Sequence, residues 1–268
     1  MSIWAAGKTA AHSYEERFFT MHIIADLHTH TNVSDHAHSS LEEMVQGAKR
    51  AGFSAIAITN HGPAMDDGAH QWHFANLNII PRKIDGITVL RGAELNILPP
   101  AGGVDRIEHK YMKNLDYVIA SFHAPCFPPA TREVHTAALE NILRNPYVTT
   151  LGHLGTEDFA FDQERIISQC NEFGKIVEIN NNSLAIRAGS RHNCTSIAKL
   201  CMKYRVPIVV TSDSHISYMV GKTQDAVKLL EEIDFPEELV INADWDRMAA
   251  YFQKIRGIDI NSFEEGVI

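Results

Sequence analysis

The sequence predicts an α/β fold, a distorted seven-stranded, TIM-like (β/α)7 barrel in a single domain. Seven short segments rich in Ile, Val, Ala and Leu have the composition of strands that are covered on both faces. Their starts, counted from Ile23, lie 28 to 32 residues apart, which is the length of one strand-plus-helix unit. No Ser/Gly/Pro-rich linker interrupts the 268 residues, a normal length for one β/α barrel.

The predicted strands follow one another in a regular order, and most of them are apolar throughout. Uninterrupted apolar runs are typical of parallel strands that helices cover on both sides. The seven strands are His22–Leu27, Ser54–Thr59, Gly86–Ala93, Leu115–Phe122, Tyr147–Gly152, Lys175–Ile179 and Val206–Thr211.

The segments between the strands carry helical signals. Ser40 and Glu43 form a capping box, in which hydroxyl and carboxylate satisfy each other's backbone donors, and Gly52 ends the helix that follows. Apolar stripes at helical spacing predict further helices. They are Val134–Leu143, Ile166–Phe173, Cys194–Met202 and a last pair, Asp225–Ile233 and Asp244–Ile255, which we expect to pack on the outside of the barrel.

Residues 1–20 show no steady hydrophobic period, and we predict that they form an N-terminal extension outside the core. Residues 21–268 then form the barrel with its C-terminal helices. No apolar run reaches the roughly 18 residues that a membrane helix needs, and residues 1–20 lack the apolar block of a signal peptide. We therefore expect no membrane partner.

Charge and cysteine usage narrow the partners and the compartment. The formal net charge is −9, with 24 Lys and Arg against 33 Asp and Glu. A sequence-independent nucleic-acid binder needs cations that displace phosphate counterions, so we predict no nucleic-acid partner. The four cysteines form no C-x-x-C pair, and Cys194 and Cys201 fall in an apolar helical stripe, which predicts reduced thiols and a cytoplasmic protein. The sequence leaves open whether the chain forms a homo-oligomer.

Metal-ligating residue types stand at the ends of six of the seven predicted strands. The carboxyl ends of barrel strands converge on one face, where active sites are found, so these side chains are expected to form one cluster. A single histidine is more often a core or surface residue, but a coincidence at six strand ends indicates a site. In chain order the residues are Asp26, His28 and His30, then Asn60 and His61, Glu94, His123, His153, and finally Asp213 and His215.

The pair His28 and His30 is informative by itself. Residues two apart on a strand point to the same side, so both imidazoles can chelate one ion.

The strand ends lie within longer motifs. These are D-L-H-T-H-T at 26–31, I-T-N-H-G-P at 58–63, G-A-E at 92–94, F-H at 122–123, G-H-L-G at 152–155 and S-D-S-H at 212–215. Together they resemble the motifs of the PHP (polymerase and histidinol phosphatase) superfamily. The segment H-x-x-H-F that ends at Phe74 is similar to the YcdX-like phosphatases, and the resemblance runs in motif order from about Ile23 to Gly257.

The resemblance implies a trinuclear metal site in which one carboxylate bridges two ions. The first ion would be held by His28, His30, Glu94 and Asp213, the second by Glu94, His123 and His153, and the third by His36, His61 and His215. Neutral imidazoles with two carboxylates suit transition metals rather than Mg²⁺. The expected cofactors are three divalent transition-metal ions, with Zn²⁺ favoured and Mn²⁺ or Fe²⁺ as alternatives.

The resemblance also implies the chemistry, that of a metal-dependent phosphoesterase which hydrolyses small phosphomonoesters. Two bridged ions roughly 3.5–4 Å apart share a hydroxide whose pKa they lower, and this hydroxide is the expected nucleophile. A phosphoester fits between the ions because they neutralise the charge on its oxygens. Glu94, Asp213 and His215 are the candidate catalytic residues, and the expected partner is a small phosphorylated substrate.

The sequence departs from the family pattern at two places. Asn60 stands where the family usually has Asp before the histidine, and an amide would keep a hydrogen bond to His61 without the charge, which puts the affinity for the third ion in question. Leu154 replaces the usual Pro after His153, which should matter less because the ligand itself remains.

Residues that contact the substrate or the ligating side chains are harder to choose. Arg187, Arg191 and Lys222 follow the sixth and seventh predicted strands and are candidate phosphate donors, with solvated loop charge as the alternative. Trp72 and His73 are expected to cover the site, with buried packing as the alternative for Trp72. Three residues are expected to support ligands rather than bind ions, with a polar pocket wall as the alternative for the last: Asp26, Asn60 and Glu178.

Three other functions remain as alternatives. An amidohydrolase-type C–N hydrolase also begins with His-x-His but typically has eight strands and a bridging lysine at the fourth. A nuclease-like phosphodiesterase would need a basic groove, which a net charge of −9 disfavours. A non-catalytic metal-binding protein would use the site for stability alone.

Overall fold

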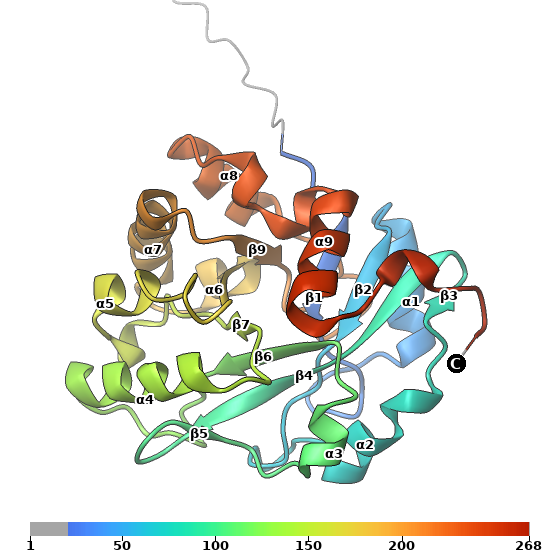
Figure 1. Ribbon diagram of the computed structural model, residues 1–268, viewed down its shortest axis with the longest axis horizontal. Coiled ribbons are helices and arrows are strands. Elements are labelled where there is room, and N and C mark those ends of the chain that lie inside the picture. Colours follow the sequence, from blue (N-terminus) through green and yellow to red (C-terminus); the bar gives the residue numbers. More distant parts are fainter. Residues whose placement is uncertain (1–20, 268) are drawn as a thin grey trace, which may run out of the picture.

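Seven parallel strands form a nearly closed barrel in the computed structural model, which describes residues 21–267 (Figure 1). In spatial order they are β1 (Ala25–Thr29), β2 (Ala55–Ile58), β4 (Ile87–Leu98), β6 (Tyr117–Ser121), β7 (Thr150–Leu151), β8 (Ile176–Asn180) and β9 (Ile208–Thr211). Two short strands, β3 (Lys83–Ile84) and β5 (Gly103–Val104), pair antiparallel with β4. The predicted seven-stranded, single-domain barrel is confirmed. The predicted extension, residues 1–20, lies outside the described residues.

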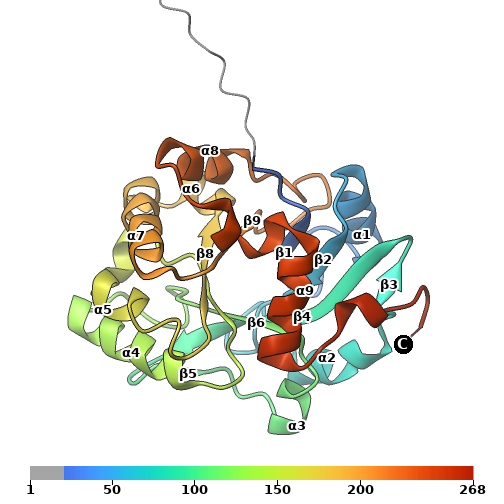
Figure 2. The same cartoon turned by 45° about the horizontal axis from the view of Figure 1, so that its top comes forward.

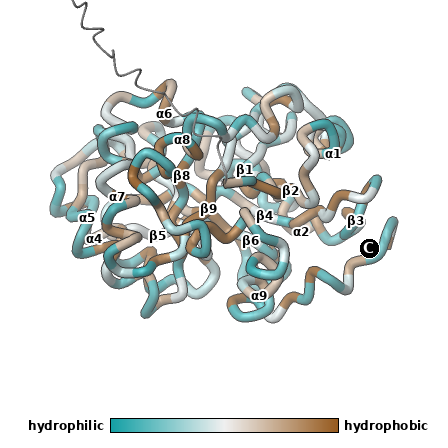
Figure 3. Tube along the Cα trace, turned by 90° about the horizontal axis from the view of Figure 1, so that it is seen from above, coloured by the Kyte–Doolittle hydropathy of each residue, from teal (hydrophilic) through white to brown (hydrophobic). Residues whose placement is uncertain are grey.

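Helices surround the barrel, and Figures 1 and 2 both show α4, α5 and α7 along one side of it and α1 along another. The helices are α1 (Leu41–Arg50), α2 (Gln71–Asn76), α3 (His109–Met112), α4 (Arg132–Arg144), α5 (Gln163–Ile167), α6 (Asn181–Ile186), α7 (Ser190–Tyr204), α8 (Gln224–Glu232) and α9 (Trp245–Arg256). Short 3-10 turns add η1 (Leu77–Ile79), η2 (Glu157–Phe159), η3 (Glu237–Leu239), η4 (Ile241–Ala243) and η5 (Ile260–Ser262). Hydrophobic residues gather on the central strands, whereas the outer helices alternate between hydrophilic and hydrophobic residues along their length (Figure 3).

The local signals of the sequence are present in the structure. Helix α1 begins with the predicted capping box between Ser40 and Glu43. The third predicted strand is the one that differs most, because β4 continues to Leu98, five residues beyond its predicted end at Ala93. Glu94 therefore lies inside the strand, where β6 pairs with it, and not after its end.

Helix α9 closes one end of the barrel instead of packing on its outside. Its Tyr251 and Phe252 belong to the same apolar cluster as Leu27 and Leu90, whose side chains fill the barrel between its strands. The expectation of an outer helix is wrong for α9, because this apolar layer would otherwise face water at the amino ends of the strands. Helix α8 packs on the outer layer, as predicted.

An irregularity in β1 brings two histidines to the inner face. Ala25 and Leu27 point into the barrel, so simple alternation would turn His28 and His30 outward. The pairing of β1 with β2 shifts register between Asp26 and Thr29, and such a bulge reverses the alternation beyond it. Both imidazoles consequently lie inside the barrel at its carboxyl end, fully buried.

The barrel closes between β1 and β9 mainly through side chains. Thr29 and Ser214 form a single parallel bridge, and His30 N donates to Ser214 O at 2.8 Å. Further along the seam, the buried amide of Asn242 donates from Nδ2 to Ala25 O (2.8 Å) and Val210 O (2.6 Å). Its Oδ1 accepts from Val210 N at 3.1 Å. One amide thus replaces the missing strand-to-strand hydrogen bonds.

Asn242→Ala is expected to lower the free energy of unfolding by about 2–4 kcal/mol, because it leaves three buried backbone groups unpaired. Chemical denaturation followed by circular dichroism measures this change. The matched control is Asn261→Ala, which removes an exposed amide that accepts from Trp245 Nε1 and should cost less than about 1 kcal/mol. Equal losses in the two variants would show that the seam does not depend on Asn242.

The cysteines are present as thiols, as the sequence predicts. All four cysteines are free, and Cys170, Cys194 and Cys201 are buried. In residues 21–267, no helix combines the length and the apolar character needed to cross a membrane.

Candidate metal centre

Four ligand atoms meet at the carboxyl end of the barrel, from β1 and the residue that follows it, from β4, and from the segment after β9. His28 Nε2 lies 3.1 Å from His30 Nε2, 3.2 Å from Glu94 Oε2 and 3.5 Å from Asp213 Oδ1. His30 Nε2 lies 3.5 Å from Glu94 Oε2 and 3.3 Å from Asp213 Oδ1. Metal–ligand bonds of about 2.0–2.1 Å put neighbouring atoms of a tetrahedral shell roughly 3.3 Å apart. The four atoms have the spacing of one metal shell.

A second group shares the other oxygen of Glu94. Oε1 lies 3.0 Å from His153 Nε2 and 3.3 Å from His123 Nε2, and these two nitrogens are 3.2 Å apart. The two oxygens of one buried carboxylate therefore face two separate sets of imidazole nitrogens. This is the arrangement that a carboxylate bridging two cations requires.

A third group of imidazoles lies beside the first. His61 Nδ1 is 2.9 Å from Glu94 Oε2, and the rings of His30, His61 and His215 offer nitrogens close enough to hold one ion. The ring of His36 stacks on those of His61 and His215, with centroids 5.1 and 4.6 Å away. His36 is the exposed member of the set, because 48% of its side chain is accessible.

Three of the histidines are oriented by a partner on the nitrogen that faces away from the cluster. Glu178 Oε1 accepts from His28 Nδ1 at 2.6 Å, and Asn96 Oδ1 accepts from His123 Nδ1 at 2.7 Å. His215 Nδ1 donates to the carbonyl of Asp213 at 3.0 Å. These hydrogen bonds leave the Nε2 lone pairs of all three rings directed at the cluster, as metal-ligating histidines require.

The electrostatics of the cluster call for added positive charge. Burial alone would raise the pKa of Glu94, but the surrounding imidazoles of His28, His123 and His61 hold that pKa well below its usual range. Burial likewise opposes the charged form of His28, yet its carboxylate neighbours raise its pKa well above the ordinary value. Burial and the Arg187 guanidinium lower the pKa of His153 to about 4, which keeps this imidazole neutral and able to bind a metal ion through its lone pair.

Unsatisfied buried atoms show that the residues present fit bound cations. Glu94 Oε2, His61 Nδ1 and His215 Nε2 are buried and make no well-oriented hydrogen bond among residues 21–267, although the first two lie 2.9 Å apart. Buried polar atoms are rarely left unpaired, and here they are the atoms that face the cluster. Nitrogen and oxygen donors of this kind suit Zn²⁺ and its transition-metal neighbours.

Two ligand positions also have strained backbones. His153 and Asp213 adopt φ values of +25° and +55°, a region that residues other than glycine rarely occupy. Such strain persists where the surroundings fix it, and it is common at functional sites. At His153 the fixing contact is the donation of its N–H to Glu178 Oε2 at 2.6 Å.

A cavity of about 400 Å³ opens onto the cluster. Its floor contains Glu94, Asp213 and four of the histidines, and its wall contains the apolar side chains of Met65, Ile186 and Met219. The cation in its lining is Arg187, which has a buried Nε without a partner among the described residues. The cavity thus combines candidate metal ligands, one free guanidinium and an apolar wall.

The other predicted substrate contacts lie elsewhere. Arg191 pairs with Glu232 at 2.9 Å on the surface, so its charge is already compensated. The neighbours of Lys222, Gly221 and Thr223, line a hollow at the amino ends of the strands, and Lys222 does not line the cavity. Trp72 is 69% exposed and does not line the cavity either. The structure therefore does not bring these three residues to the cluster.

Asn60 and His73 form a pair beneath the loop that carries His36. Asn60 Oδ1 accepts from Thr31 N at 2.8 Å, and its Nδ2 lies 3.1 Å from His73 Nε2. Burial lowers the pKa of His73 to about 4, so this ring is neutral and accepts from the amide. A carboxylate could not donate that hydrogen bond, which explains why an amide and not an acid stands at position 60. The expectations that Asn60 contacts the ring of His61 and that His73 covers the site are wrong.

Asp26 supports the cluster through the chain and not through a ligand side chain. It accepts from the hydroxyl of Ser212, from Ser212 N at 3.1 Å and from Gly221 N at 3.0 Å. These contacts fix the start of the segment that carries Asp213 and His215.

Two residues that position ligands are not predicted from the sequence. Asn96 orients His123, and its position two residues after Glu94 on β4 was a usable signal, because both then face the barrel interior. Asp67 accepts from His36 Nδ1, but it lies in a loop where no periodicity singles it out.

Comparisons with known proteins agree with this arrangement. The model of the PHP domain matches residues 26–186. A protein named probable phosphatase from Acetivibrio thermocellus is 44% identical over 234 residues, which cover 87% of this chain and 97% of that protein. One of the same name from Caldicellulosiruptor bescii is 41% identical over 241 residues, covering 90% of this chain and 100% of that protein.

Solved structures share the fold at low sequence identity. Histidinol phosphate phosphatase from Lactococcus lactis, complexed with zinc, L-histidinol and phosphate, has a TM-score of 0.55 and 17% identity over 79% of this chain and 94% of its own. An amidohydrolase from Pseudomonas aeruginosa has a TM-score of 0.50 and 10% identity over 88% of this chain and 97% of its own. At these identities the likeness concerns the fold alone.

Proposed function

Because the chain belongs to the PHP domain family, we propose that it is a metal-dependent phosphatase that hydrolyses small phosphomonoesters with three divalent ions. The hydrolysis of phosphoric esters follows from the family and from relatives named probable phosphatases. The number of ions, their identity and the small substrate are our inference from the cluster. The observation that carries it is Glu94, whose two oxygens face separate groups of imidazole nitrogens.

We propose His28, His30, Glu94 and Asp213 for the first ion and Glu94, His123 and His153 for the second, because their ligand atoms have the observed spacing. For the third ion we propose His36, His61 and His215. The nitrogens of His61 and His215 are close enough to hold an ion together with His30, and the ring of His36 stacks on both. The bound cations would supply a water molecule of lowered pKa and neutralise the charge on the phosphate oxygens. Zn²⁺ is our first choice because nitrogen donors predominate, and the Lactococcus lactis protein holds zinc.

The remaining cavity residues act on the substrate. The unpaired guanidinium of Arg187 can donate two parallel hydrogen bonds to a phosphate, which orients the ester over the cluster. Met65, Ile186 and Met219 would contact the leaving group and exclude water around it. A cavity of about 400 Å³ with a single arginine suits a compact phosphomonoester better than a nucleic-acid strand.

The alternative of a C–N hydrolase is less well supported. Seven parallel strands form the barrel in residues 21–267 in place of eight. The bridging carboxylate is Glu94 of β4, and His123 follows β6, the fourth strand of the barrel, where a bridging lysine would be needed. The three free and buried cysteines support our further proposal of a reducing, cytoplasmic location.

Hydrolysis of a phosphomonoester such as p-nitrophenyl phosphate is expected to exceed that of its diester, because a dianion gains more from several cations than a monoanion does. Chelation should abolish the activity, and Zn²⁺, Mn²⁺ or Fe²⁺ should restore it. Steady-state rates with both esters and a panel of amides, alongside metal analysis, test this. Equal rates in chelated and metal-loaded protein would contradict a metal-dependent reaction, and faster amide hydrolysis would favour the C–N hydrolase.

A further inference from the structure

A second hollow, of about 460 Å³, lies at the opposite end of the barrel from the metal cluster. Its wall includes Leu115 and Asp116, which precede β6, and Tyr147, which precedes β7, so it sits at the amino ends of the strands. The last turn of α9 contributes Arg256. The hollow is therefore separate from the candidate metal centre.

Cationic side chains predominate in this hollow, although the chain as a whole carries a net charge of −9. Arg82, Arg91, Lys113 and Arg256 line it, and Asp116 is the carboxylate among its lining residues. Asp116 is buried, and its Oδ2 already accepts from the side chain of Arg82 and from Arg91 N. One carboxylate cannot compensate four positive charges, so the lining keeps an excess of cation.

The hydrogen-bond donors of the hollow also exceed its acceptors. Arg91 is only 6% exposed, and its Nε is buried without a partner among the described residues. The Arg256 guanidinium donates to the backbone carbonyls of Leu115 and Met112, and Arg91 donates from Nη2 to the carbonyl of Ile80. The ammonium of Lys113, also in the lining, is exposed and has no hydrogen-bond partner among the described residues. A buried guanidinium N–H without an acceptor is costly, and an anion in the hollow would supply one.

The mutual repulsion of the arginines gives a second reason for an anion. Burial and the neighbouring charge of Arg82 lower the pKa of Arg91. An anion placed between these side chains would relieve both effects, because it returns an opposite charge to a desolvated cation.

We propose that this hollow binds a small oxyanion of the phosphate type, held by the Nε–H of Arg91 and the ammonium of Lys113. Several converging cations favour a dianionic phosphate group over a single carboxylate, and the planar guanidinium matches tetrahedral oxyanions. The site lies on the same strand as Glu94, since β4 carries Arg91 near its amino end and Glu94 three residues later.

The test is calorimetric titration of the metal-loaded protein with inorganic phosphate. Two sites per chain are expected, one at the metal cluster and one in this hollow. Arg91→Lys keeps the positive charge but removes the planar guanidinium with its several N–H donors. It should weaken only the site in the hollow, by roughly tenfold. Lys113→Ala should also weaken only that site, whereas Arg187→Ala should weaken only the site at the cluster. Acetate at equal ionic strength should not occupy the hollow.

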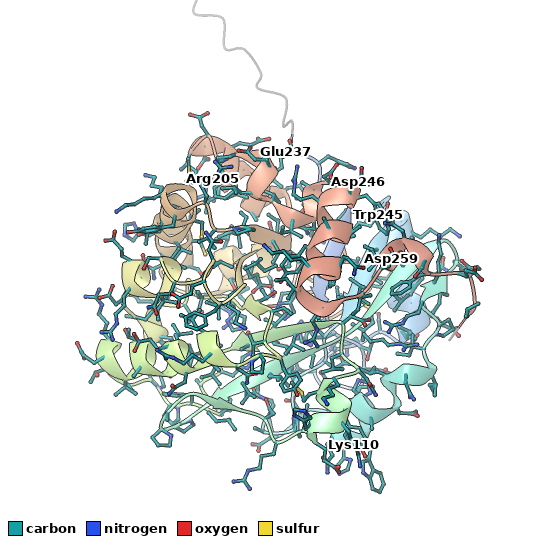
Figure 4. All side chains as sticks on the ribbon, in the orientation of Figure 1. Lys110, Arg205, Glu237, Trp245, Asp246 and Asp259 are labelled. Atoms are coloured by element: carbon teal, nitrogen blue, oxygen red, sulfur yellow. The ribbon has the colours of Figure 1, made fainter. Side chains whose placement is uncertain are left out.

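Lys110→Ala is the matched control, because Lys110 lies on α3, three residues from Lys113, and points away from the body of the protein (Figure 4). It pairs with Glu108 at 2.8 Å and should leave both sites unchanged. Circular dichroism and the melting temperature establish that each variant is folded. A single phosphate site in the unmodified protein would overturn the proposal, as would a second site that Arg91→Lys leaves intact.

Discussion

Glu94→Gln is expected to lower turnover of a phosphomonoester by at least about a thousandfold and to release metal from the protein. Glu94 is the carboxylate whose oxygens face two groups of imidazoles, His28 with His30 and His123 with His153. An amide has the same shape but no charge, so two cations held close together would repel each other with less compensation. At least one ion should dissociate, and hydrolysis of the ester, which depends on the ions, should be lost.

The matched variant is His36→Ala, which affects only the third proposed ion. His36 stacks on His61 and His215 at the exposed edge of the cluster, and it has no close contact with Glu94 among the described residues. It should release about one metal equivalent and lower turnover by less than Glu94→Gln does. Metal analysis of the two purified variants, with rates on one phosphomonoester, decides the outcome. If His36→Ala keeps its full metal content, the three-ion proposal reduces to two ions.

Glu178→Gln is expected to weaken metal binding by about 10–100-fold without removing any proposed ligand. Oε1 of Glu178 accepts from His28 Nδ1 and from the hydroxyl of Thr211, both at 2.6 Å, while Oε2 accepts from His153 N. A glutamine has one oxygen and one NH₂ group, so in either orientation a donor would face a donor. Depending on which way the amide turns, either His28 loses the acceptor that fixes its tautomer or the strained backbone at His153 loses its anchor, and both residues are proposed ligands.

Competition with a chelator of known affinity measures the first effect, and chemical denaturation should show a loss of about 1–3 kcal/mol. Glu164→Gln serves as the control, since Glu164 is exposed and pairs with Lys203 at 2.6 Å on the surface. That variant should change neither quantity appreciably. Unchanged metal affinity in Glu178→Gln would mean that neither His28 nor His153 depends on this carboxylate for its position as a ligand.

The residues that contact the substrate could not be chosen from the sequence alone. Arg187, Arg191 and Lys222 all follow late strands, and nothing in the sequence distinguishes one from another as a phosphate donor. In the structure Arg187 faces the cavity without a partner, whereas Arg191 is paired with Glu232. The difference depends on which helix turn carries each residue and on what packs beside it, and neither is encoded by local spacing.

Asn60 illustrates a different reason for failure. The sequence predicts that its amide contacts the ring of His61, which follows it, but in the structure the amide contacts Thr31 and His73. Hydrogen-bond partners of a buried amide are chosen by the folded environment, and a neighbour in sequence has no advantage when the strand turns it away.

The sequence by itself determined the barrel and the chemical type of its site. Strand composition, the spacing near 30 residues and the placement of His and carboxylate residues on or just after six of the seven strands are local features, and they are present in the structure. Only the tertiary structure decided how the ligands are oriented and how the barrel closes. His28 meets Glu178 across 150 residues of chain, and Asp26 meets Ser212 across 186. Such contacts depend on the curvature of the sheet and the bulge in β1, which no short window of sequence specifies.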